Sequence, residues 1–167
     1  RPTQDSSSAA SEVYKRQVIS LLTAFNSIGA IVGSFLVVFF SKIKSKGLLV
    51  LGATFVYGIL LIIFGLSTSL IIGVVIITLL GATDAVGMTV RQAIVQLTSP
   101  DHLRGRAVSL HSVAAMTANN VGHFEIGITS ELIGTRNTLI LGGIISCIVV
   151  FLIWKLFKGV GTYKLDV

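Results

Sequence analysis

Two acidic residues stand inside long apolar stretches of the sequence. Asp84 lies in the stretch 70–90, and Glu125 lies in the stretch 107–130. A carboxylate inside a membrane is costly unless it is paired, protonated or exposed to water. A carboxyl whose pKa is raised by desolvation can carry a proton at neutral pH. Asp84 and Glu125 are therefore candidates for proton coupling. For Asp84 the alternative is a structural hydrogen bond to a neighbouring helix.

The stretch that contains Glu125 is also the most polar. On a helical wheel of 100° per residue, Ser112, Asn119 and His123 lie within about 40° of one another. Such a face favours a position toward a cavity or a polar interface. His123 has a side chain that titrates near neutral pH, but an intramembrane histidine is more often a hydrogen-bonded packing residue. Glu125 lies outside this face, on the side of His111.

Two further apolar stretches carry small and polar residues. In the stretch 18–40, Asn26 accompanies Gly29 and Gly33, whose four-residue spacing lets another helix approach closely. Packing within one bundle is favoured over dimerisation. Arg91 follows Asp84 on roughly one helical stripe, about 10 Å further along the helix. This spacing predicts no direct contact between the two, although both can line one pathway.

The side chains of these polar helices suggest a cavity that binds a small-molecule substrate. The predicted cavity-lining residues are Asn26, Asp84, Ser112, Asn119 and His123.

No enzyme signature is present. The sequence has no Ser–His–Asp order in a strand–turn–helix setting, no HExxH motif and no phosphate-binding loop. His111 and His123 are about 18 Å apart along one helix and cannot bind one metal ion together. The single cysteine, Cys147, cannot form an intrachain disulfide or a multi-thiolate site. We predict no catalytic residue, no metal site and no cofactor. An intramembrane enzyme would need His123 and Glu125 on one cavity wall, which the helical wheel disfavours.

Five apolar stretches must position these residues. Each has about the 20 residues that a helix needs to cross a hydrocarbon core of about 30 Å. Helices are favoured over strands because the apolar runs are continuous and every backbone group must be satisfied within its segment. The sequence predicts an all-α membrane protein with five transmembrane helices in residues 18–157, followed by a cytoplasmic tail, 158–167. The expected helices are 18–40, 47–66, 70–90, 107–130 and 138–157.

The composition and charge distribution agree with a membrane protein. The chain of 167 residues is 53% hydrophobic and only 12% charged, against about 25% charged residues in soluble domains. Its net charge is +6, but the basic residues do not form one patch. The connections between the helices are alternately rich and poor in basic residues. By the positive-inside rule, the rich connections and the C-terminus are cytoplasmic, and no nucleic-acid partner is implied. We expect the basic residues of these cytoplasmic loops to form a gate. They are Lys42, Lys44, Lys46, Arg91, Arg104 and Arg106.

The loop before the fourth helix and the N-terminal segment have their own patterns. Ser99, Pro100 and Asp101 are typical of a helix start, which predicts a short surface helix. Residues 1–17 are predicted to be disordered, because residues 1–12 are polar and lack periodicity. Residues 13–17 (VYKRQ) resemble the translated end of a sequencing adapter. We expect the natural sequence to resume near Val18 and the chain to be truncated at its N-terminus.

Several of these segments resemble the major facilitator superfamily. Asp84-Ala85, the run 91–96 (RQAIVQ) and the run 98–106 (TSPDHLRGR) resemble the cytoplasmic end of helix ten and the following loop. The run 119–127 (NNVGHFEIG) resembles helix eleven of the enterobactin-exporter-like branch, with its N-E-x-G-E-F-E-x-G pattern. Asn119 and Glu125 match that pattern, whereas Asn120 and His123 replace acids. Lys42 likewise stands where the acid of the loop motif would be.

The resemblance implies that the five helices are the eighth to twelfth of a twelve-helix fold, in its C-terminal half. It implies a proton-coupled exporter, an antiporter, for a drug- or siderophore-like molecule in a bacterial cytoplasmic membrane. The expected partners are the lipid bilayer, the substrate and the missing N-terminal half, with a monomer at full length. Without that half, we expect no transport. The alternative is a small non-transporting membrane subunit or scaffold that is complete as five helices.

Overall fold

The computed structural model describes residues 3–40 and 45–156, and every regular element in this part of the chain is an α-helix. The expected all-α fold class is therefore confirmed. In chain order the helices are α1 (Thr3–Phe40), α2 (Lys46–Leu66), α3 (Leu70–Thr98), α4 (Arg104–Ile133) and α5 (Thr135–Leu156).

Four of these helices are long and apolar enough to cross a membrane: α1 over Val13–Phe39, and α2, α3 and α5 over their whole lengths. The fourth predicted span, α4, has 30 residues and the necessary length. It does not reach the same apolarity, because polar side chains such as Asn119, His123 and Glu125 interrupt its aliphatic residues. The structure thus supports four of the five expected spans on composition.

The first helix is longer than the sequence predicts. It begins at Thr3 instead of Val18, so the expected disorder of residues 1–17 does not hold for residues 3–17. No glycine or proline interrupts this segment. Extending an existing helix adds one hydrogen bond per residue without a new nucleation cost. The helix therefore propagates beyond its apolar part.

The connection between α3 and α4 also differs from the prediction. The expected short surface helix is a single turn, in which Leu103 N donates to Pro100 O at 2.9 Å. Ser99 does not cap a new helix, because its hydroxyl donates to Val95 O at 2.6 Å and so belongs to the end of α3. At the other end of α4, Gly134 takes a positive φ of 83° and separates α4 from α5.

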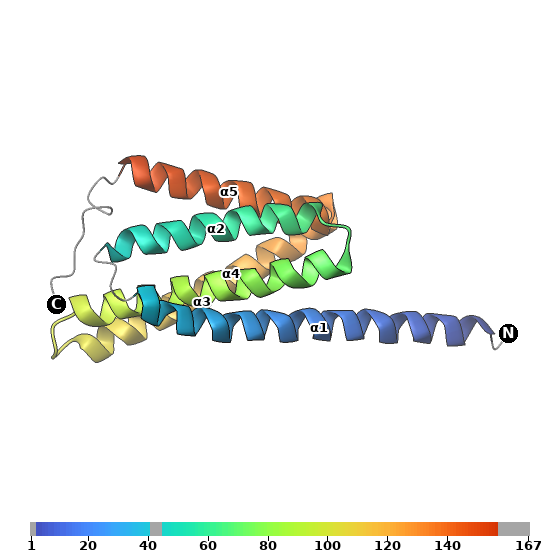
Figure 1. Cartoon of the computed structure of the whole chain (residues 1–167), viewed down its shortest axis with the longest axis horizontal. Helices are drawn as coiled ribbons and strands as arrows, with labels where there is room; N and C mark the ends of the chain where they lie inside the picture. Colours follow the sequence, from blue (N-terminus) through green and yellow to red (C-terminus); the bar gives the residue numbers. More distant parts are fainter. Residues whose placement is uncertain (1–2, 41–44, 157–167) are drawn as a thin grey trace.

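The helices pack in one layer with α4 behind it. Figure 1 shows α5, α2, α3 and α1 side by side in that order, with α4 crossing at the back. The neighbouring pairs in the layer pack on each other, whereas α4 contacts only α3 and α5 among the described helices. Within the described residues, α1 and α2 do not pack on each other. The third helix, which contacts three others, supplies most of the buried apolar core through Ile76, Leu80, Val86 and Val90.

Glycines allow the closest helix crossings. A Cβ atom at Gly29 or Gly33 of α1 would collide with the backbone of Thr78 or Ala82 of α3. In return, a Cβ at Gly81 of α3 would collide with the backbone of α1. The small-residue spacing in α1 therefore serves packing within the bundle, as expected. The crossing of α2 and α5 uses glycines in the same way.

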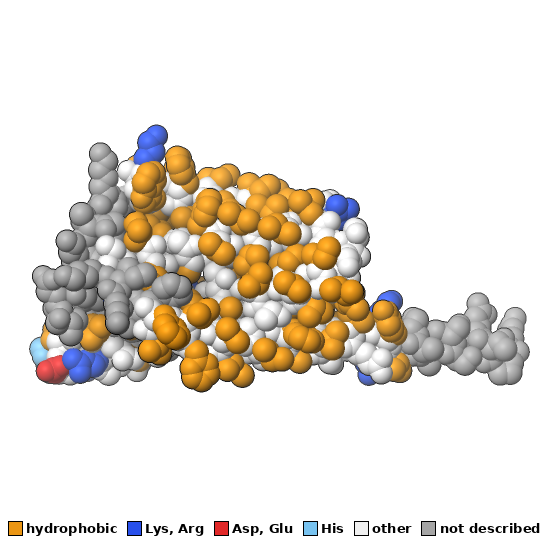
Figure 2. Space-filling model, in the orientation of Figure 1, with side chains coloured by type: hydrophobic (Ala, Val, Ile, Leu, Met, Phe, Trp, Pro, Cys, Tyr) orange, Lys and Arg blue, Asp and Glu red, His pale blue; other side chains and the backbone are white. Residues whose placement is uncertain are grey.

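The molecule exposes a surface suited to lipid. Hydrophobic side chains cover the middle of the face in Figure 2, and basic side chains lie toward its ends. Large aliphatic and aromatic residues remain exposed along all five helices. In water such a surface would drive association, whereas in a bilayer the acyl chains cover it.

Candidate functional site

Asp84 and Arg91 form a pair along one face of α3. Arg91 Nη2 lies 4.0 Å from Asp84 Oδ1, and Arg91 Nε donates to Gly87 O at 3.1 Å. The expectation that the two residues are too far apart for contact is wrong. Helix rise measures backbone separation, whereas a long side chain on a helix leans back toward the N-terminus and covers the preceding turns.

The pair is only weakly constrained. The Asp84 side chain is 63% exposed and that of Arg91 is 49% exposed. A pair of this length and exposure contributes little to stability. The geometry places a carboxylate and a guanidinium next to each other on α3.

Asn26 lies at the crossing of α1 and α3. Its Nδ2 donates to Ile77 O at 3.4 Å, and its own backbone carbonyl lies against Gly81. The side chain is half-buried and tied to the neighbouring helix. In the structure, Asn26 therefore links α1 to α3. Its place in the wall of a cavity stays a prediction.

The polar face of α4 is open. Ser112, Asn119 and His123 are all exposed, as is Glu125 on another side of the helix. None of the four forms a hydrogen bond or ion pair with other described residues, and no residue of α4 is buried. The structure does not bring them together with Asp84. No group of three or more potential metal ligands occurs among the residues that the structure covers.

The basic residues of the predicted gate differ in their surroundings. Arg104 clamps the α3–α4 connection, because its Nε donates to Gln96 O at 3.1 Å and its Nη2 pairs with Asp101 Oδ1 at 2.5 Å. Arg106 is exposed and forms no hydrogen bond or ion pair within the described chain. Lys46 begins α2, whereas Lys42 and Lys44 lie outside the described residues.

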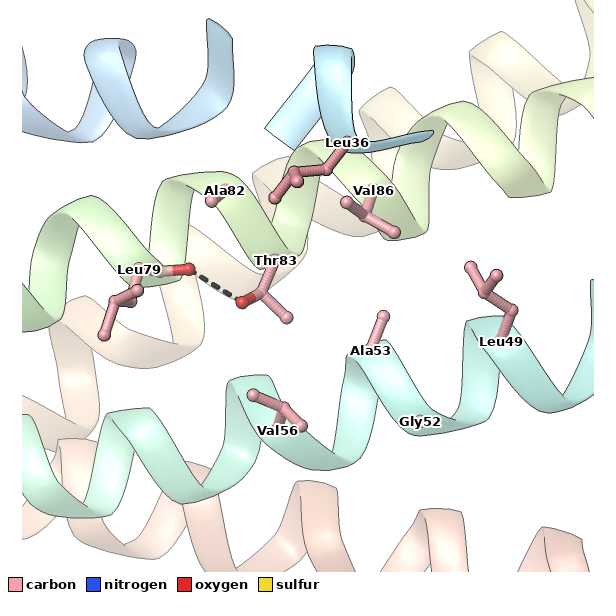
Figure 3. Close-up of a pocket in the computed structure, with 9 residues that line it drawn as sticks. All are labelled: Leu36, Leu49, Gly52, Ala53, Val56, Leu79, Ala82, Thr83 and Val86. Atoms are coloured by element: carbon pink, nitrogen blue, oxygen red, sulfur yellow. Dashed lines mark hydrogen bonds between the residues drawn. The ribbon is translucent and has the colours of Figure 1, made fainter. Parts of the chain in front are cut away.

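A hollow with an almost wholly apolar lining lies elsewhere, between α1 and α2 with α3 as its floor. We call it the α1–α2 groove. It has a volume of about 380 Å³, and Figure 3 shows its walls. Its single polar side chain, Thr83, donates its hydroxyl to Leu79 O at 2.7 Å and offers no free donor. The lining residues are Leu36, Leu49, Gly52, Ala53, Val56, Leu79, Ala82, Thr83 and Val86.

None of the residues predicted to line a cavity lines this groove. Its signal in the sequence is the run of small residues on the facing sides of two helices, at Gly52 and Ala53 and at Ala82 and Thr83. That signal acquires meaning only when the two helices are known to be neighbours. The polar residues that indicate the other candidate sites do not mark this groove, because its lining is almost wholly apolar.

Comparison with known proteins agrees with the membrane architecture. The family described as transmembrane secretion effector, within the major facilitator superfamily, matches residues 15–160. No curated protein and no solved structure matches the chain. The match covers most of the sequence and includes all the membrane-spanning helices and the α3–α4 connection. The chain is a multi-pass membrane protein that belongs to the transmembrane secretion effector family of major facilitator transporters.

Proposed function

We propose that the five helices are helices eight to twelve of a twelve-helix secondary active exporter of small organic molecules. The family match over residues 15–160 carries this proposal. It is supported by the open polar face of α4, whose Ser112, Asn119 and His123 lack partners among the described residues. Polar groups at membrane depth need protein partners or a water-filled cavity. An N-terminal half packed beside α4 would supply both.

In this proposal the polar helices line the substrate pathway and the plain ones shield it. Transporters of this architecture bind substrate between two halves and expose it alternately to the two sides of the membrane. Ser112, Asn119 and His123 would contact the substrate by hydrogen bonds from α4. The mostly apolar helices α2 and α5, which pack on each other, would face lipid.

Proton coupling is assigned to Asp84 and Glu125. Glu125 has no hydrogen-bond partner within the described chain, and Asp84 is held only by a 4.0 Å contact with Arg91. A carboxylate without a strong partner pays a large desolvation cost when a cavity closes around it. Closure would then favour uptake of a proton, and reopening to the other side would favour its release. Such a cycle couples substrate export to the proton gradient.

The proposed orientation places the connection between α3 and α4 and the C-terminus in the cytoplasm of a bacterium. It follows the positive-inside rule, because the α1–α2 and α3–α4 connections carry the basic residues. Arg104 would keep the α3–α4 turn closed, while Lys42, Lys44, Lys46, Arg91 and Arg106 would provide the positive charge of the cytoplasmic gate.

The coupling proposal can be tested in the full-length transporter. Purified protein is reconstituted into liposomes, and flux of organic dyes and catecholate chelators is measured with and without a pH gradient. We expect Asp84→Asn or Glu125→Gln to lower gradient-driven flux by about tenfold or more, because a group that transfers protons is lost. Glu131→Gln, at the exposed end of α4, is the matched control and should behave as wild type. Coupling unchanged in both variants would exclude these carboxyls.

The fragment proposal has its own test. We expect the 167-residue chain in liposomes to give no substrate-specific uptake, because one incomplete half cannot alternate access. Full-length protein, in parallel liposomes, should transport the same compounds. Specific uptake by the short chain would refute the proposal. A gene whose reading frame begins near residue 1, with no helices encoded upstream, would instead favour a non-transporting subunit.

A further inference from the structure

We propose that the α1–α2 groove binds one acyl chain of an anionic phospholipid, whose headgroup lies beside Lys46. This inference concerns the surface of the bundle and is independent of the transport pathway. It follows from the way the groove is formed, from the chemistry of its lining and from the charge at its end.

The groove exists because two helices share a support without touching. The helices α1 and α2 each pack on α3, but no contact joins them within the described residues. Small residues on α3, Ala82 and Thr83, form the floor between them. On the α2 wall, a Cβ atom at Gly52 would meet no atom within 4 Å. The space beside Gly52 is therefore not filled by neighbouring side chains.

The lining of the groove selects a hydrocarbon. The hydroxyl of Thr83 donates to Leu79 O, so the walls offer no free side-chain donor. The rim residues Leu36, Val56 and Leu79 are 39%, 47% and 48% exposed and would meet the bilayer. The volume of about 380 Å³ is more than twice that of a cavity of about 150 Å³ that stays dry and admits benzene. In a membrane, the abundant molecule that fits an open apolar groove is a lipid tail.

The end of the groove at the start of α2 is next to a lysine. Leu49 lines the groove near the start of α2, and Lys46 precedes it by three residues, which places both on one side of the helix. Basic side chains near a membrane surface attract anionic headgroups. Lys46 thus favours a phospholipid with a negative headgroup over a zwitterionic one with the same chains.

Native mass spectrometry of the purified 167-residue chain tests the proposal. The detergent-solubilised protein is titrated with phosphatidylglycerol, and bound lipids are counted. We expect one tightly retained phosphatidylglycerol, and an affinity about tenfold lower for phosphatidylcholine with the same chains. Lys46→Gln should remove most of this preference. Equal affinity for the two lipids would overturn the assignment of an anionic lipid.

Variants that fill the groove test the position of the acyl chain. Val56→Phe places a ring at the rim, and Val149→Phe on α5 is its matched control, since the two valines are 47% and 45% exposed. Val149 does not line the α1–α2 groove. We expect Val56→Phe to lower retention of phosphatidylglycerol by about tenfold and Val149→Phe to leave it unchanged.

Glycine variants give a second, independent pair. Gly52→Leu adds a side chain where α2 borders the groove, whereas Gly142→Leu adds the same atoms on α5, and neither added Cβ meets an atom within 4 Å. Circular dichroism establishes that each variant keeps its helices. Retention of lipid at the wild-type level in both groove variants would overturn the proposal. A dimer that disappears on filling the groove would do the same, since the occupant would then be a second copy of the chain.

Discussion

At the scale of single residues, the arginines at the α3–α4 end of the bundle have distinct roles. Arg91 reaches back along α3 to Gly87 O and Asp84, and Arg104 reaches across the connection to Gln96 O and Asp101. A guanidinium can serve two acceptors at once because its donors point in fixed, different directions. Arg106 has no such partner in the described chain. The same residue type therefore braces the backbone at two positions and supplies unpaired charge at a third.

Replacement of Arg104 by lysine tests this bracing. Arg104→Lys keeps the charge but cannot bridge Gln96 O and Asp101 together, so we expect the turn to open more readily, by about 0.5–1.5 kcal/mol. Hydrogen exchange of the amides at Leu103 and Ala107, which close this turn, measures the change. Arg106→Lys is the matched control and should leave their exchange as in wild type. Equal exchange in both variants would show that Arg104 does not hold the turn.

At the scale of elements, α1 and α3 cross so closely that glycines of each helix lie directly against the backbone of the other. Gly29 and Gly33 present α1 to Thr78 and Ala82, while Gly81 presents α3 to the backbone of α1. In a membrane, helices associate through close packing, because the lipid tails are as apolar as the helices and no hydrophobic force drives the helices together. These glycines therefore decide which helices become neighbours, although glycine itself weakens a helix.

Alanine at one of these positions should separate the two helices. Gly81→Ala places a methyl group against the carbonyl of Asn26, and we expect a loss of about 1–3 kcal/mol in the free energy of unfolding from overpacking. Gly142→Ala, where a Cβ meets nothing within 4 Å, should instead gain up to about 1 kcal/mol from helix propensity. Unfolding in mixed detergent micelles measures both. A stable Gly81→Ala variant would contradict the close crossing.

At the scale of the whole molecule, α4 is held less firmly than the other helices. It crosses behind the layer, has no buried residue and, of the helices that the structure describes, contacts only α3 and α5. Helices with few buried contacts open at low free energy. The open polar face of α4 is also where the proposed N-terminal half would pack.

Hydrogen exchange can compare the short chain with the full-length transporter. In the 167-residue chain, we expect amides in the middle of α4 to exchange about tenfold faster than those in the middle of α3. In the full-length protein, α4 should slow by a similar factor, while α5 should change little. Both samples are measured in lipid nanodiscs. Exchange of α4 that is the same in the two proteins would show that the proposed N-terminal half does not cover this helix.

Several features could be read from local sequence. The apolar stretches beginning at Gly47 and Leu70 correspond closely to the starts of α2 and α3, and the spacing of Gly29 and Gly33 indicated a close helix contact. The fold class followed from the same runs. The predicted start of the first helix, Val18, was wrong. The apolar run begins there, but the helical hydrogen bonding extends further toward the N-terminus, through polar residues.

The sequence by itself determined the helices, because length and continuous apolarity depend on residues a few positions apart. Only the tertiary structure decided which helix faces meet. It paired Asp84 with Arg91 through the reach of a side chain, and it separated α1 from α2 so that small residues such as Gly52 and Thr83 border a groove. These outcomes depend on contacts between residues far apart in the chain. No periodicity within one helix specifies them, because each face can pack on several neighbours.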